Sequence, residues 1–219
     1  IHDMALTSRY LVLFVCPLIF DLEAAMTGGS LLSWQPDDGT RIALIPRDGG
    51  PVRWVQTDPF WVWHFANAFD RPTAGGGTEI VVDFTQWSRT AIAGEGPITG
   101  HITRAVLDPA AGTYRAEHFD DAGAEFSRID DRLTGREHRY FITTTRTGAV
   151  PPGEKNLLQR IDTRTGEISR WDSGDHIFEE VCFVPAPNSE PVAPPPRALR
   201  TCKPSSRSRP LSSSHSDLP

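Results

Sequence analysis

Short stretches of alternating hydrophobic and polar residues recur along this chain, and apolar residues spaced for an amphipathic helix are hard to find. The clearest strand-like stretches are TRIALIPRDGGPVRWVQ, GTEIVVDFTQW, HRYFITTT and NLLQRIDTRTGEISRW. Several contain Asp or Gly at points where the chain would reverse in a β-hairpin. The pattern therefore predicts an all-β protein.

Two of these segments share one arrangement. RAVLDPAAGTYRAEHF at 104–119 and LQRIDTRTGEISRW at 158–171 each contain a strand, an Asp, a Gly four residues later and a second strand. LLSWQPDDGTRIALI at 31–45 is a looser version. Repeated hairpins without intervening helices predict four-stranded units, and the β-propeller is the commonest large assembly of such units. Spacing alone leaves a β-sandwich open as the alternative.

The composition changes abruptly near residue 190. The segment EPVAPPPRALRTCKPSSRSRPLSSSHSDLP at 190–219 contains seven Pro and seven Ser. It has too few apolar residues for their burial to offset the conformational entropy lost on ordering. We therefore predict a folded part over residues 1–189 and a disordered tail over residues 190–219. We also expect this tail to be out-of-frame translation.

Charge and cysteine content narrow the class of protein. With 22 basic and 28 acidic residues the net charge is −6, and no basic stripe is present, so a nucleic-acid partner is not expected. The longest apolar run, at 11–20, is ten residues and too short to span a bilayer. Three cysteines without CxxC spacing favour a reducing cytoplasm over a secreted, disulfide-linked β-sandwich. Because the first residue is Ile1, we expect a fragment of a longer protein.

One histidine lies inside an aromatic stretch, WVWHFANAFD at 61–70. If 61–69 is a strand, its large side chains share one face and His64 lies on the other with Val62, Ala66 and Ala68. Small neighbours leave space for a metal at the ring, although a buried histidine bonded to a carbonyl fits equally. His2 opens a second stretch, IHDMALTSRYLVLF, where alternation leads into a continuous apolar run.

Both stretches resemble known motifs. HDMALTSRYLVLF is similar to the HDF-(A/G)-(I/L/M)-T-x-x-Y signature of the carotenoid cleavage oxygenase family, which includes retinal pigment epithelial membrane protein and the apocarotenoid and lignostilbene dioxygenases. WVWHFANAFD resembles the family's (V/L)-F-H-(H/F)-x-N-(A/T)-(F/Y/W)-(D/E) segment. GTRIALIPR, AEFSRIDDRLTGREHRY and LLQRIDTRTGEISRW with EEVCFVP match further segments. The five matches follow the family's order from residue 1 to about residue 189.

The resemblance implies a fold and a chemistry. The family is a seven-bladed β-propeller that holds one non-haem Fe(II) through four histidines and uses O₂ to cleave a carbon–carbon double bond of a carotenoid, apocarotenoid or stilbene. On this resemblance the chain covers the middle and later blades, with His2 as the second iron ligand and His64 as the third. Neutral imidazole suits ferrous iron.

The resemblance also implies carboxylates behind the ligands. Glu125 and Glu180 match glutamates that hold ligand histidines in the family, although a solvated Glu is the ordinary alternative. Ser127 and Val181 stand where the family has proline. The first ligand would precede Ile1, and no fourth ligand is recognisable; His215 receives no role.

The remaining histidines (His101, His118, His138 and His176) are expected to be exposed, and Trp34, Trp54 and Trp171 to pack between sheets. The favoured function is an Fe(II)-dependent dioxygenase acting on an apolar polyene or stilbene, with peripheral membrane contact to extract its substrate. The alternative is a catalytically inactive propeller remnant with at most a binding role. The sequence predicts neither the cleavage position nor an oligomeric state.

Overall fold

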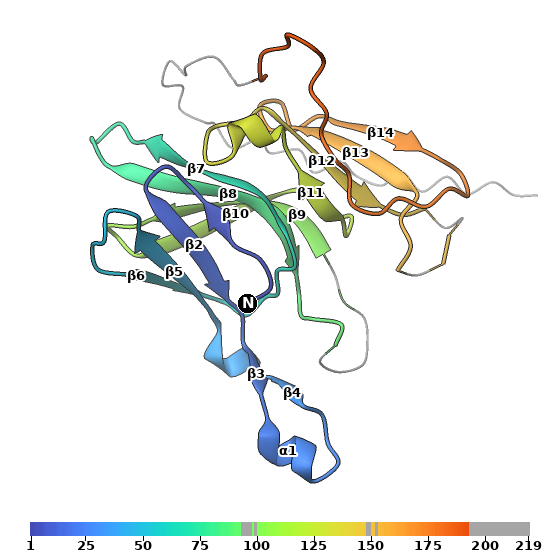
Figure 1. Cartoon of the computed structure of the whole chain (residues 1–219). Coiled ribbons are helices and arrows are strands. Elements are labelled where there is room, and N and C mark those ends of the chain that lie inside the picture. Colours follow the sequence, from blue (N-terminus) through green and yellow to red (C-terminus); the bar gives the residue numbers. More distant parts are fainter. Residues whose placement is uncertain (93–97, 99, 148–149, 152, 193–219) are drawn as a thin grey trace, which may run out of the picture.

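A computed structural model describes residues 1–92, 98, 100–147, 150–151 and 153–192. Short strands dominate it, which confirms the prediction of an all-β protein (Figure 1). The elements in chain order are β1 (Ala5–Leu6), β2 (Tyr10–Val15), β3 (Leu18–Phe20), α1 (Leu22–Met26), β4 (Leu32–Trp34), β5 (Thr40–Pro46), β6 (Arg53–Thr57), β7 (Phe65–Pro72), β8 (Thr78–Trp87), β9 (Gly100–Asp108), β10 (Thr113–Asp120), β11 (Glu125–Arg128), β12 (Tyr140–Thr145), β13 (Leu157–Asp162) and β14 (Ile168–Asp172). Single turns of 3₁₀ helix occupy Pro36–Asp38 and Asp131–Leu133.

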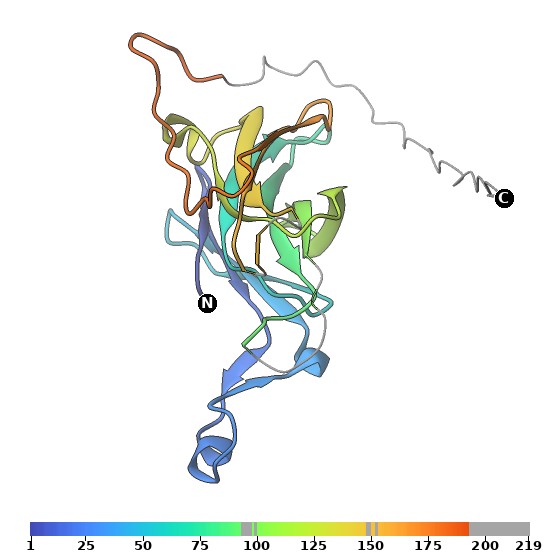
Figure 2. The same ribbon diagram turned by 90° about the vertical axis from the view of Figure 1, so that its right-hand side faces the viewer.

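Twelve of the strands form three four-stranded antiparallel sheets, as the repeated hairpins predict. The strand orders are β1-β2-β5-β6, β10-β9-β8-β7 and β11-β12-β13-β14. The first strand of each sheet in the sequence lies at one edge, and β7 contacts both β1 and β11. The three edge strands are thus neighbours, and the sheets spread away from them (Figures 1 and 2).

The Asp and Gly of the two clearest repeats form the same turn. In the β9–β10 turn the Asp108 carboxylate accepts hydrogen bonds from the Ala110 and Ala111 amides, and the Gly112 amide donates to the Asp108 carbonyl. Asp162 and Gly166 repeat this between β13 and β14. Both glycines have positive φ, 65° and 74°, which glycine adopts at little cost. The hairpin prediction for 104–119 and 158–171 is confirmed.

The third version of the repeat, at 31–45, was predicted wrongly. β4 pairs with β3 and β5 pairs with β2, so the two strands of this segment belong to different sheets. Between them, the 3₁₀ turn that begins at Pro36 ends at Gly39, whose φ is 64°. β3, α1 and β4 form an arm that projects from the sheets (Figures 1 and 2). We call Leu18–Trp34 the arm.

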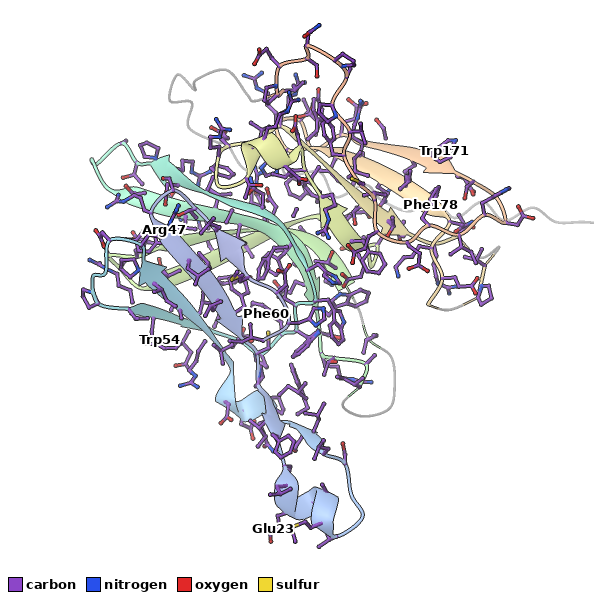
Figure 3. The ribbon with its side chains drawn as sticks, in the orientation of Figure 1. Glu23, Arg47, Trp54, Phe60, Trp171 and Phe178 are labelled. Carbon is purple, nitrogen blue, oxygen red and sulfur yellow. The ribbon has the colours of Figure 1, made fainter. Side chains whose placement is uncertain are left out.

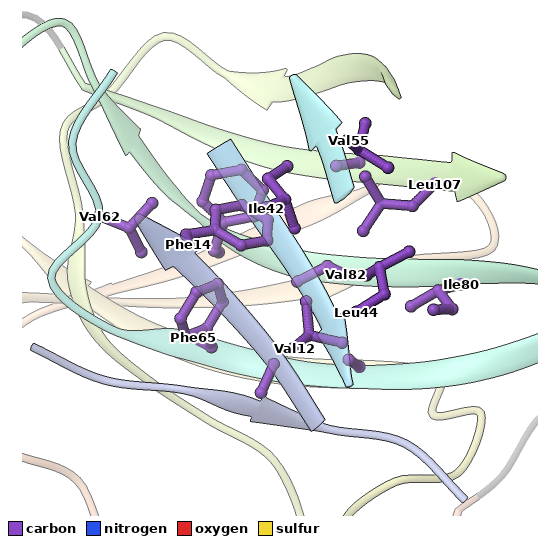
Figure 4. Packing of buried hydrophobic residues seen from close by; sticks show 14 of the residues in the cluster. Val12, Phe14, Ile42, Leu44, Val55, Val62, Phe65, Ile80, Val82 and Leu107 are labelled. Atoms are coloured by element: carbon purple, nitrogen blue, oxygen red, sulfur yellow. The ribbon is translucent and has the colours of Figure 1, made fainter. Parts of the chain in front are cut away.

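Apolar side chains fill the spaces between adjacent sheets. The largest cluster joins the first two sheets through Val12, Phe14, Ile42, Leu44, Val55, Phe65, Ile80, Val82, Phe84 and Leu107 (Figure 4). A second cluster joins the second and third sheets through Ala66, Ile102, Ala124, Ile129, Leu133, Phe141 and Ile161. Sheets packed face to face in series are the arrangement of propeller blades.

Two of the three tryptophans expected between sheets are exposed. Trp54 on β6 is 54% exposed and lies near the Arg41 guanidinium, and Trp171 on β14 lies against Phe178. Figure 3 shows both at the periphery, whereas Phe60 points into the first core. They are exposed because β6 and β14 are the last strands of their sheets. Trp34 is half-buried at the base of the arm.

Most of the predicted tail at 190–219 lies outside the described residues, which end at Val192. Over the described ranges, no helix has the length and apolar character needed to cross a membrane.

Candidate metal centre

The starts of the three edge strands bring the candidate residues together. His2 lies three residues before β1, His64 immediately precedes β7, and Glu125 is the first residue of β11. The ring centroids of His2 and His64 are 5.1 Å apart, with the ring planes at 80°. The structure therefore places the two predicted ligands side by side although 62 positions separate them. Their role as iron ligands stays a prediction.

The Glu125 carboxylate determines the protonation of His64. His64 Nδ1 lies 2.8 Å from Glu125 Oε2. Because an ionised carboxylate only accepts hydrogen bonds, Nδ1 carries the proton and the neutral ring offers its Nε2 lone pair to a metal. The hydrogen bond to Glu125 raises the pKa of His64; burial opposes this, and the charges of Asp3 and Glu180 add to it.

Glu125 is buried, with only 7% of its surface exposed, and its backbone carbonyl is hydrogen-bonded to β12. The Thr143 and Thr144 hydroxyls donate to its carbonyl at 2.9 and 3.0 Å. The next residue, Phe126, has a φ of 56°, a left-handed conformation that is uncommon outside glycine. This turn directs the Glu125 carboxylate to His64 and brings the Phe126 ring centroid to 5.3 Å from the His64 ring.

The strand predicted at 61–69 begins later than expected. β7 starts at Phe65, and Trp61 forms only an isolated bridge to Trp87. The pairing of β7 with β8 shifts by one residue between Phe65 and Asn67, so the simple alternation of faces fails. Phe65 and Ala68 consequently enter the first core, while Ala66 enters the second. His64 thus lies immediately before the first residue of β7 rather than within the strand.

The position of His2 depends on two aspartates that the sequence argument passed over. The Asp3 carboxylate accepts hydrogen bonds from the amides of Met4 at 2.7 Å and Phe65 at 3.0 Å, which fastens the His2 segment to the start of β7. At the other end, Asp70 accepts hydrogen bonds from the Thr7 and Ser8 hydroxyls. Asp3 and Thr7 lie in HDMALTSRYLVLF and Asp70 lies in WVWHFANAFD. Their places in these two motifs were the sequence signal that could have identified them.

Glu180 forms its ion pair with Arg128 and not with either histidine. Its carboxylate is 56% exposed and pairs with the Arg128 guanidinium at 2.7 Å. Its charge nevertheless contributes to the raised pKa of His64. Its role behind a ligand stays a prediction.

The prediction of an exposed His138 was wrong. His138 is 1% exposed, between the second and third sheets. Its Nδ1 accepts from the Asn67 amide at 3.0 Å, and its Nε2 lies 3.1 Å from Asp83 Oδ2. Asp83 is in turn bonded twice by Arg104, at 2.8 and 2.7 Å. His118 and His176 are exposed as expected, and His101 is half-buried.

The residues present fit a metal only in part. No group of three or more His, Cys, Asp or Glu side chains with metal-binding geometry occurs within the described ranges. Two adjacent imidazoles, one with its Nδ1 already bonded to a carboxylate, would be half of the four-histidine set that the resemblance implies. A cavity of about 230 Å³ is lined by Asp3, Phe65, Asn67, Arg128 and neighbouring residues, and neither His2 nor His64 is among the residues that line it.

Comparisons with known proteins show which family this chain belongs to. Residues 1–192 match the family model described as retinal pigment epithelial membrane protein. A carotenoid cleavage oxygenase of Mycobacterium tuberculosis is 30% identical over 169 residues, covering 72% of this chain and 33% of the relative. An apocarotenoid-15,15'-oxygenase of Synechocystis is 26% identical over 204 residues, covering 85% of this chain and 40% of the relative.

Among solved structures, the lignostilbene dioxygenase of Pseudomonas brassicacearum superimposes with a TM-score of 0.75 at 28% identity, covering 87% of this chain and 44% of that one. The prediction of a partial β-propeller is therefore confirmed. The chain spans about a third to two fifths of the length of the two curated relatives.

Proposed function

Because this chain belongs to the retinal pigment epithelial membrane protein family and is similar to a carotenoid cleavage oxygenase, we propose that it is part of a non-haem Fe(II)-dependent dioxygenase. The substrate class is a carotenoid, an apocarotenoid or a stilbene, cleaved at a carbon–carbon double bond into two carbonyl products. The observation that supports this most directly is that the rings of His2 and His64 lie 5.1 Å apart, with Glu125 bonded to His64 Nδ1.

Each residue of the site has a distinct task in this proposal. His2 and His64 would supply two imidazole ligands, and Glu125 keeps the proton of His64 on Nδ1. Phe126 lies against the His64 ring and Trp63 against the His2 ring, at centroid distances of 5.3 and 5.1 Å. Fe(II), when bound, would activate O₂ for cleavage of the double bond.

The size of the cavity favours an incomplete substrate site. Pockets for small organic ligands occupy roughly 300–1,000 Å³, and the cavity lined by Asp3 and Phe65, which follow His2 and His64 in the sequence, has about 230 Å³. This cavity is therefore too small to enclose an extended polyene. The same observation supports the second candidate, a catalytically inactive propeller remnant with at most a binding role.

Metal content separates the two candidates. The chain would be purified without oxygen in the presence of Fe(II), and bound iron measured per chain. Stoichiometric iron that is lost in His2→Gln and His64→Gln supports the dioxygenase, and absence of iron supports the remnant. Iron-loaded chain exposed to O₂ with an apocarotenal or a stilbene would then be assayed for carbonyl products by mass spectrometry.

We also propose that the arm contacts a lipid surface, from which an apolar substrate would be extracted. The arm exposes Ile19, Phe20, Leu22, Met26 and Leu31 on a projection from the sheets (Figure 1). Apolar side chains on a protruding element can enter the boundary between headgroups and acyl chains.

Co-sedimentation with phosphatidylcholine vesicles tests this contact. Met26→Asp is expected to reduce vesicle binding, whereas Val184→Asp, at a residue that is also 80% exposed but lies outside the arm, leaves it unchanged. Equal vesicle binding by the native chain, Met26→Asp and Val184→Asp would show that the arm does not contact lipid.

A further inference from the structure

Trp87, at the end of β8, is bonded to the carboxylate that holds His64. Its indole Nε1 donates a hydrogen bond to Glu125 Oε1, while Glu125 Oε2 faces His64 Nδ1 at 2.8 Å. An indole N–H can only donate, so it requires an acceptor on Oε1 and leaves Oε2 as the oxygen available to His64. Trp87 lies in the second sheet and Glu125 in the third, so this bond also joins two sheets.

The Trp87 ring occupies a slot between two glycines. A Cβ placed on Gly100 would lie 2.8 Å from carbons of the ring, and a Cβ on Gly123 would also lie 2.8 Å from it. Contacts of that length do not occur between real side chains, so any larger residue would displace the indole. Neither glycine has a positive φ, so space rather than backbone conformation accounts for glycine at both positions.

The backbone of Trp87 is held as firmly as its ring. Trp61 and Trp87 exchange two backbone hydrogen bonds, at 2.8 and 2.9 Å. Trp61 lies three residues before His64, so one bridge ties the chain leading to the ligand to the residue that holds its carboxylate.

We propose that Trp87 is a positioning residue of the candidate metal centre. Its N–H orients the Glu125 carboxylate so that His64 keeps its proton on Nδ1 and presents Nε2 to the metal. The role toward a metal rests on the proposed function, whereas the effect on the His64 tautomer does not. Neither the quoted motifs nor the spacing of histidines pointed to this residue.

Trp61 supplies a matched control for the loss of an indole N–H. Its Nε1 is buried and has no hydrogen-bond partner in the part of the chain that the structure describes. Trp87→Phe and Trp61→Phe therefore make the same chemical change in neighbouring positions, but only the first removes a hydrogen bond to Glu125. Gly123→Ala is a third variant, which keeps the N–H and displaces the ring.

The first readout is the His64 tautomer in the metal-free chain, measured by nitrogen NMR on histidine-labelled protein with the ring neutral. His64→Gln identifies the signal. The native chain and Trp61→Phe are expected to show the Nδ1–H form, and Trp87→Phe and Gly123→Ala a mixture with the Nε2–H form. An unchanged tautomer in Trp87→Phe, or an equal change in Trp61→Phe, would overturn the proposal.

The second readout is Co(II) affinity, with His118→Gln in every protein. That change removes the stacked pair of His101 and His118, whose ring centroids are 4.5 Å apart, as a competing site. Loss of an outer hydrogen bond costs roughly 10–100-fold in metal affinity, and this is the loss expected for Trp87→Phe and Gly123→Ala but not for Trp61→Phe. Equal affinity in Trp87→Phe and the native chain would overturn the proposal. If the native chain binds no Co(II), the proposed function fails and the tautomer still decides the role of Trp87.

Discussion

At the scale of single residues, the candidate centre depends on where one proton lies. His64 has two ring nitrogens, and the Glu125 carboxylate at 2.8 Å fixes the proton on Nδ1. The carboxylate is in turn held by Trp87 on its other oxygen and by backbone strain at Phe126. A single histidine orientation is therefore supported by Glu125, Phe126 and Trp87, which come from two separate parts of the sequence.

Replacing Glu125 by Gln tests this dependence. The side chain keeps its shape but loses the charge that favours a proton on His64 Nδ1, so we expect Co(II) affinity to fall roughly 10–100-fold. Titration followed by visible absorption measures it. Glu79→Gln is the control, because Glu79 pairs with Arg71 and Arg115 on the second sheet. Equal affinities in both variants would contradict the role given to Glu125.

Two cysteines of this chain are expected to differ in reactivity. Burial raises the pKa of the Cys16 thiol from 9.0 to about 11, whereas Cys182 is exposed. Because the thiolate is the reactive form, a rise of this size lowers its population on the order of 100-fold at neutral pH. Alkylation with iodoacetamide, followed by peptide mass spectrometry, should label Cys182 first. Comparable rates at both sites would show that Cys16 is not buried in solution.

The sequence predicted part of the candidate site and missed the rest for physical reasons. His2, His64 and Glu125 were recognisable because motif residues carried them, and the structure brings all three together. Trp87 was not recognisable, since its partner lies 38 positions away and its slot is visible only once Gly100 and Gly123 are placed in space. Burial of His138 likewise depends on Asp83 and Arg104, from another sheet.

At the scale of elements, turn chemistry explains which hairpins could be predicted. Asp108 and Gly112, and Asp162 and Gly166, form complete turns within five consecutive residues, so local sequence is sufficient. The segment at 31–45 has similar letters, but β4 pairs with β3 inside the arm, whereas β5 pairs with β2, which precedes the arm. Strand pairing at long range cannot be read from local spacing, and the prediction failed there.

The turn at Gly166 gives a test at this scale. Its φ is 74°, and a Cβ would meet nothing within 4 Å, so Gly166→Ala adds only backbone strain. We expect a loss of unfolding free energy of about 1–2 kcal/mol, measured by urea unfolding. Gly75→Ala is the matched control, since its Cβ also meets nothing within 4 Å and its φ is not positive. A loss in Gly75→Ala equal to that in Gly166→Ala would argue against strain as the cause.

At the scale of the whole molecule, stability depends on how the sheets join. The first two sheets are joined mainly by the apolar side chains of the cluster in Figure 4, with hydrogen bonds from Thr7 and Ser8 to Asp70 at one edge. The second and third sheets add a buried polar network, in which Arg104 and His138 surround the fully buried Asp83. Breaking a buried charge pair by removing one partner costs about 3–5 kcal/mol, whereas replacing both partners costs far less.

The charge on Asp83 makes the joint between these sheets sensitive to acid. Burial alone would raise the pKa of Asp83, but the charge of Arg104 and the hydrogen bonds from Arg104 and His138 hold it below its ordinary value. A carboxyl with a lowered pKa stabilises the folded state above its unfolded pKa of about 3.9. That contribution disappears as pH falls through the folded pKa.

We therefore expect the unfolding free energy of the native chain to fall between about pH 6 and pH 2. Asp83 should account for a part of this loss on the order of 2 kcal/mol. The double variant Asp83→Asn with Arg104→Met removes both charges and should lack this part of the loss. Asp130 and Asp162, whose pKa values are also lowered, titrate in both proteins and cancel in the difference. Urea unfolding at a series of pH values measures it, and parallel curves for the two proteins would show that the pair does not hold the sheets together through its charge.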